Sequence, residues 1–178
     1  YTGRHKILTR YQSYHGSSNG AITASGDPRK LPVDSQQAPN FVHFDLPYLY
    51  RWEYGEENLL KESVASLEKI IAYEGPGNIA AILLEGESGS SGCFKYPVGY
   101  LKAVREICNK HGILLIMDEV MSGFGRTGKW FGFQNHDIIP DMIAMAKGLT
   151  CGYLPFGCLQ VSNKIAAKFD DTVLALGL

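Results

Sequence analysis

Two short apolar runs, each ending in an ionisable residue, constrain the fold of this chain more than any other feature. The first run, ILLIM, ends at Asp118 and Glu119, and the second ends at Lys147. A short apolar run bounded by turn residues is typical of a strand buried on both faces, as in a parallel sheet. Open α/β sheets bind ligands at the carboxyl ends of such strands. The two runs therefore predict a carboxylate and an amine at the ligand-binding edge of a sheet.

The elements expected around these runs alternate between helix and strand. Apolar spacing predicts a helix over residues 58–73, a buried strand over 79–84 and a second helix that Pro97 opens. The strands that end in the ionisable residues follow, and a last strand is expected over 157–161. This alternation implies an α/β fold with a mostly parallel, doubly wound sheet.

The first third of the chain gives weaker signals. Residues 6–11 (KILTRY) form a short candidate strand, and a turn-rich stretch over 13–21 follows it. Residues 24–57 are rich in Pro, Gly, Asp and Gln, which predicts a long irregular segment. A loop of this length is usually functional or packs on a partner, and its scattered aromatic residues favour coverage by a neighbouring subunit.

Composition and charge exclude several functions. The 178 residues carry a formal net charge of −1, which removes the electrostatic case for nucleic acid or an acidic membrane as a partner. No apolar run approaches the roughly 18 residues that span a bilayer. The four cysteines lack metal-ligand spacing, and we interpret them as reduced thiols of a cytoplasmic protein without a metal site. Because both ends lack polar linkers, residues 1–178 are expected to be part of a longer chain.

Lys147 has apolar neighbours on both sides, in the sequence MAKGL. Such surroundings disfavour the ammonium form, so they lower the pKa of a lysine and make its free amine a usable nucleophile. The alternative is a lysine at a strand end whose ammonium group reaches solvent.

Asp118 follows ILLIM without a polar break, and an aspartate is rarely buried without a partner. It is therefore a metal ligand or the partner of a cationic ligand, and the lack of a nearby cluster of His, Asp or Cys disfavours the metal. A pyridinium nitrogen fits, so our interpretation is that Asp118 pairs with the ring nitrogen of pyridoxal phosphate and Lys147 forms a Schiff base with it. Strand alternation gives Glu119 a structural role on the opposite face and returns Val120 to the face of Asp118.

Two glycine-containing stretches are less specific. Tyr14 lies in SYHGSSNGA, where glycine lets the backbone approach closely and an aromatic ring can lie flat on a ligand; a plain surface loop is the alternative. The loop GFGRTG at 123–128 lacks the lysine and the spacing of a P-loop. We interpret it as a structural loop that lines the cleft.

Four stretches in order resemble the class III (ω) aminotransferases, which are fold-type I pyridoxal phosphate enzymes. They are SYHGSSNGA, AAILLEGESGSSG, GILLIMDEVMSGFGRTGKWFGF and PDMIAMAKGLTCGYLPFG. The resemblance implies that residues 1–178 are the central part of the large cofactor-binding domain, without the upstream phosphate loop or the C-terminal small domain. It implies transamination between an amine and a 2-oxo acid, in active sites built between the subunits of a homodimer. The isolated chain is expected not to turn over.

The resemblance also implies roles for five residues. Lys147 bonds to the cofactor and moves a proton between the substrate Cα and the cofactor, while Asp118 binds the pyridine nitrogen. Tyr14 stacks on one face of the ring and Val120 presses on the other. Glu85 matches the family's switch glutamate, whose arginine partner lies in the C-terminal domain.

Two residues depart from the family pattern. Gly86 stands where many members have proline, and Met121 where many have a glutamine that reaches the cofactor's phenolic oxygen. These departures indicate a subgroup, and the surrounding sequence is most similar to the taurine–pyruvate type, which passes amino groups from ω-amines to pyruvate. Two alternatives stay open: a class III aminomutase, which GFGRTG disfavours, and a non-catalytic domain, which the joint presence of Tyr14, Asp118 and Lys147 disfavours.

Overall fold

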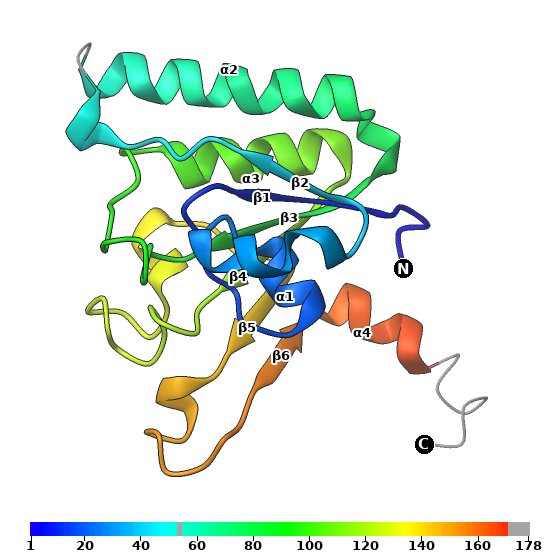
Figure 1. Ribbon diagram of the computed structural model, residues 1–178, viewed down its shortest axis with the longest axis vertical. Coiled ribbons are helices and arrows are strands. Elements are labelled where there is room, and N and C mark those ends of the chain that lie inside the picture. Colours follow the sequence, from blue (N-terminus) through cyan, green and yellow to red (C-terminus); the bar gives the residue numbers. More distant parts are fainter. Residues whose placement is uncertain (53–54, 171–178) are drawn as a thin grey trace.

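A six-stranded sheet in the order β2-β1-β3-β4-β5-β6 runs through the computed structural model, which describes residues 1–52 and 55–170 (Figure 1). The strands are β1 (Lys6–Arg10), β2 (Phe41–Phe44), β3 (Ile79–Glu85), β4 (Leu114–Asp118), β5 (Met142–Met145) and β6 (Cys158–Val161). The α-helices are α1 (Asn19–Ala24), α2 (Glu56–Glu74), α3 (Tyr100–His111) and α4 (Asn163–Asp170). Figure 1 shows α2 and α3 stacked on one side of the sheet, with α3 next to the strands and α1 on the other side.

The strands from β2 to β5 pair in parallel, and only β6 runs antiparallel to its neighbour within the described residues. The predicted α/β fold with a mostly parallel, doubly wound sheet is therefore confirmed. The helix expected over 58–73 and the strand expected over 79–84 correspond to α2 and β3. The second helix starts later than predicted, because Gly99 has a left-handed φ of 86° and α3 begins only at Tyr100.

The prediction of an irregular segment over residues 24–57 is wrong in part. The segment contains the edge strand β2 and two 3₁₀ helices, Pro28–Gln36 and Leu49–Arg51. The sequence FVHF favours a strand, but the run has only four residues and turn-forming residues flank it, so the surrounding pattern indicates a loop. Its last residue, Phe44, is buried in the core, whereas Tyr50 is exposed and Tyr54 lies outside the described residues.

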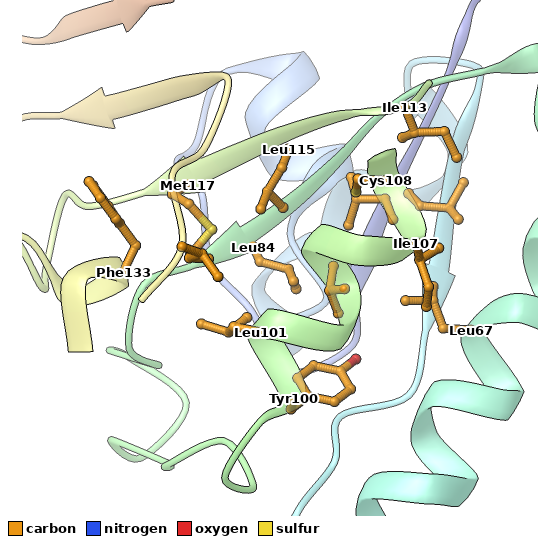
Figure 2. Packing of buried hydrophobic residues seen from close by; sticks show 14 of the residues in the cluster. Leu67, Leu84, Tyr100, Leu101, Ile107, Cys108, Ile113, Leu115, Met117 and Phe133 are labelled. Carbon is orange, nitrogen blue, oxygen red and sulfur yellow. The ribbon is translucent and has the colours of Figure 1, made fainter. Parts of the chain in front are cut away.

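The hydrophobic core lies between the sheet and α3. Figure 2 shows Leu115 and Met117 of β4 pointing toward Leu84 and toward Leu101 of α3. Burial of each such side chain stabilises the fold by about 1.5–3 kcal/mol. Because side chains alternate along a strand, the residue after Met117 faces the other side of the sheet. The packing of β4 on α3 thereby orients Asp118.

The structure also bears on membrane spans, cysteines and metal sites. No described helix is long and apolar enough to cross a membrane. All four cysteines are free thiols, of which Cys108 of α3 is buried. Burial raises the pKa of the Cys108 thiol to about 12. No group of three or more His, Cys, Asp or Glu that could hold a metal occurs in residues 1–52 and 55–170.

We expect Cys108 to resist alkylation in the native protein. With a pKa of about 12, only roughly one thiol in ten thousand is ionised at pH 8, and the thiolate is the reactive form. Iodoacetamide labelling followed by peptide mapping should leave Cys108 unmodified in the native protein and modify it fully in urea. Equal labelling of native and unfolded protein would contradict the packing of α3.

Candidate functional site

Asp118 ends β4 and is buried, with 7% of the residue exposed. Its Oδ1 accepts a hydrogen bond from the backbone N of Val120 at 2.9 Å, and its Oδ2 lies 2.7 Å from Nδ1 of His15. No lysine or arginine of the described chain forms an ion pair with this carboxylate. A buried carboxylate without a permanent cation beside it suits a positively charged ligand.

His15 is fixed at both ring nitrogens. Besides the contact with Asp118, its Nε2 lies 3.3 Å from the hydroxyl of the buried Thr9. Its backbone N donates to Ser25 Oγ at 2.8 Å. Sequence reasoning gave His15 no role, although its place just after the carboxyl end of β1 was a signal, since parallel strands bring such positions to one edge. His15 therefore orients Asp118.

Tyr14 precedes His15 and lies half-buried at the same edge. Its hydroxyl lies 2.6 Å from Ser17 Oγ, and its backbone N is 3.4 Å from Glu85 Oε1. The guanidinium of Arg29 lies 3.7 Å from the centre of the ring. Both the backbone and the hydroxyl of Tyr14 are thus held by neighbours.

Glu85, at the end of β3, forms a buried ion pair with Arg10, the last residue of β1. Arg10 Nε also donates to the hydroxyl of Tyr96 at 3.1 Å, and that hydroxyl donates to the carbonyl of Glu85 at 3.1 Å. Burial raises the pKa of Glu85, and the charge of Arg10 opposes the rise. Sequence reasoning missed Arg10 as a partner of Glu85 within this chain.

Lys147 opens the 3₁₀ turn Lys147–Leu149 directly after β5. Asp118 pairs in register with Ala144, so Lys147 comes three residues beyond the position next to Asp118. Of the two environments that the sequence left open for Lys147, the structure has the exposed one, whereas Met145 is buried. Neither Asp nor Glu forms an ion pair with Lys147 in the part of the chain that the structure describes.

Glu119 follows the last residue of β4, and Val120 lies in the turn after it. Val120 is half-buried beside Asp118, to which its backbone N donates. Glu119 is fully buried, and its carboxylate accepts hydrogen bonds from Ser122 Oγ and from the backbone N of Gly132 and Phe133. The structural role predicted for Glu119 is therefore confirmed.

A cavity of about 820 Å³ opens on the α3 side of this edge. Its lining includes Glu87, Lys102 and Met121, but neither Asp118 nor Lys147. The residues that carry the candidate chemistry gather instead where β1, β4 and β5 end. There the chain presents a buried carboxylate, an aromatic ring and an amine without a carboxylate partner.

Comparisons with known proteins agree on one family. A family model for class-III aminotransferases matches residues 1–174. The chain is 37% identical over 164 residues to a taurine–pyruvate aminotransferase of Bilophila wadsworthia, covering 92% of this chain and 36% of that protein. It is 38% identical over 167 residues to the uncharacterized aminotransferase YhxA of Bacillus subtilis, covering 94% of this chain and 37% of that protein.

Solved structures give the same result. A taurine:2-oxoglutarate aminotransferase from Bifidobacterium kashiwanohense, in complex with PLP and glutamate, superposes with a TM-score of 0.93 at 47% identity, covering 97% of this chain and 40% of that chain. An (S)-enantioselective omega-transaminase from Thermomicrobium roseum gives 0.91 at 41% identity, covering 95% and 38%. The chain therefore spans about two fifths of the length of these proteins.

We expect the Arg10–Glu85 pair to contribute strongly to stability. Arg10→Met leaves the Glu85 carboxylate buried without its partner, which costs about 3–5 kcal/mol of unfolding free energy. The control is Lys110→Met, which removes the solvent-exposed ion pair with Glu68 and costs less than about 1 kcal/mol. Urea unfolding of the full protein measures both, and equal losses would contradict the burial of the pair.

Proposed function

The chain belongs to the class-III aminotransferase family, and on this premise we propose that the protein transfers an amino group from an amine or amino acid to a 2-oxo acid with pyridoxal phosphate. The carrying observation is the pairing of β4 with β5, which brings Asp118 and Lys147 to one sheet edge. The residues present fit the cofactor, because Asp118 is a buried carboxylate without a lysine or arginine partner among the described residues. When bound, pyridoxal phosphate supplies a ring that takes up electrons from the substrate.

Four residues carry the proposed site. Asp118, oriented by His15, holds a proton on the pyridine nitrogen, and this keeps the ring electron-poor. Lys147 would hold the cofactor through its amine, and the free amine would take up the proton that leaves the substrate Cα. Tyr14 and Val120 would hold the cofactor ring between them.

Glu85 belongs to the same proposal as a substrate-side carboxylate. Its ion pair with Arg10 and its contact with the backbone of Tyr14 support a second task, which is to hold the Tyr14 segment in place. The relatives favour taurine or another ω-amine as the amino donor and pyruvate or 2-oxoglutarate as the acceptor.

The proposal includes a homodimer in the cytoplasm. Free thiols at all four cysteines support a reducing compartment. The turn between β5 and β6 carries large exposed apolar side chains, Tyr153, Leu154 and Phe156. Such a patch is typical of a protein interface.

The test is reduction with borohydride in the presence of pyridoxal phosphate, followed by peptide mass mapping of the full protein. We expect a pyridoxyl group on Lys147, no label in Lys147→Ala, and loss of at least about 10³-fold in transamination of taurine with pyruvate in that variant. The matched control, Lys164→Ala, changes an exposed lysine of α4 and should keep label and activity. Label spread over several lysines, or activity retained in Lys147→Ala, would refute the proposal.

A further inference from the structure

The segment between β4 and β5 folds back onto its own start through Glu119. The Glu119 carboxylate accepts hydrogen bonds from Ser122 Oγ at 2.7 Å, from Gly132 N at 2.8 Å and from Phe133 N at 2.9 Å. One buried side chain therefore ties the beginning of the loop to its end. We call residues 119–133 the closed loop.

The closed loop is also joined to β5 at its base. The backbone N of Glu119 donates to the carbonyl of Ala144 at 2.8 Å, which extends the β4–β5 pairing by one hydrogen bond. Asp118 directly precedes this contact on one strand, and Lys147 follows it by three residues on the other. The base of the loop is thus next to Asp118 on one strand and three residues before Lys147 on the other.

The closed loop contacts the turn that carries Lys147 through Phe124. Phe124 packs so closely on Gly148 that a methyl group at position 148 would lie 2.8 Å from both Cβ and Cδ2 of Phe124. Phe124 itself has a left-handed φ of 59°, and its backbone N donates to the carbonyl of Trp130 at 2.6 Å. Its ring meets that of Phe131 edge-on, with centroids 5.7 Å apart.

Within the described residues, the backbone hydrogen bonds of the turn at Lys147 are local. Leu149 N donates to the carbonyl of Ala146 at 2.7 Å and Cys151 N donates to the carbonyl of Gly148 at 3.3 Å, so they hold the shape of the turn but not its place relative to β4. Lys147 is exposed, and its flexible side chain moves with the backbone that carries it. A contact from outside the turn would help to keep the amine in one position. Phe124 makes such a contact at Gly148.

We propose that Phe124 is a positioning residue, through which the closed loop sets the place of Lys147 relative to Asp118. The inference rests on the proposed function, since it concerns the amine that reacts with the cofactor. Phe124 acts by contact with Gly148 and touches neither substrate nor cofactor in this role. Glu119 supports it by closing the loop.

The first variant is Gly148→Ala in the full protein. Gly148 does not have a left-handed φ, and the three atoms nearest to the added methyl group all belong to Phe124, so a clash with Phe124 is the main expected effect. We expect kcat to fall about 10- to 100-fold with KM changed less than about threefold, because a small displacement of a reacting group costs rate rather than binding. The pH at which the visible absorbance of the bound cofactor changes should also shift, as a readout of the Lys147 environment that does not depend on turnover.

Two further variants and a control complete the experiment. Phe124→Gly removes the atoms that the new methyl group meets, but it also removes the contact that positions the turn, so Phe124→Gly combined with Gly148→Ala should have a kcat no higher than that of Phe124→Ala. Phe124→Ala, which adds no atom, should lower kcat by itself and covers the case in which Gly148→Ala does not fold. Gly77→Ala places a methyl group in open space away from the site and should match the wild type.

The outcomes separate the two proposals. Unchanged kcat and absorbance in Gly148→Ala and Phe124→Ala, or wild-type kcat in the double variant, would overturn the role of Phe124 while borohydride labelling of Lys147 upholds the proposed function. Failure of the wild type to label at Lys147 would instead overturn the proposed function.

Discussion

The parallel pairing of β4 with β5 is the constraint on which the rest of the structure depends. Parallel strands end at the same edge, so the register that places Asp118 beside Ala144 also decides where Lys147 emerges. A slip of one residue would turn Asp118 to the opposite face, among the apolar side chains that pack on α3. The dense core around Met117 opposes such a slip, and in this way apolar packing fixes the position of two polar groups.

Sequence reasoning succeeded where the information is local. The run ILLIM is long and apolar enough to specify a buried strand, and its alternation correctly separated Asp118 from Glu119. The helical spacing of residues 58–73 likewise identified α2. Each of these predictions depends on the chemistry of one continuous segment, which the amino-acid order contains in full.

It failed where the partner lies far along the chain. Arg10 and Glu85 are 75 residues apart in the sequence, and His15 and Asp118 are 103 residues apart. No local sequence pattern therefore predicts either pair. The strand β2 is stabilised by β1 beside it rather than by its own four residues. Met145 is buried and Lys147 is exposed, a choice between two environments that the sequence left open.

The position of β6 at the edge of the sheet has a consequence for how this polypeptide behaves in isolation. Within the described residues, β6 pairs only with β5, so its other side presents unpaired backbone N–H and C=O groups. Leu159, near the middle of the strand, is 56% exposed. An open edge with apolar side chains is a template for pairing with further strands, which makes this part of the sheet an aggregation hazard wherever it is not covered.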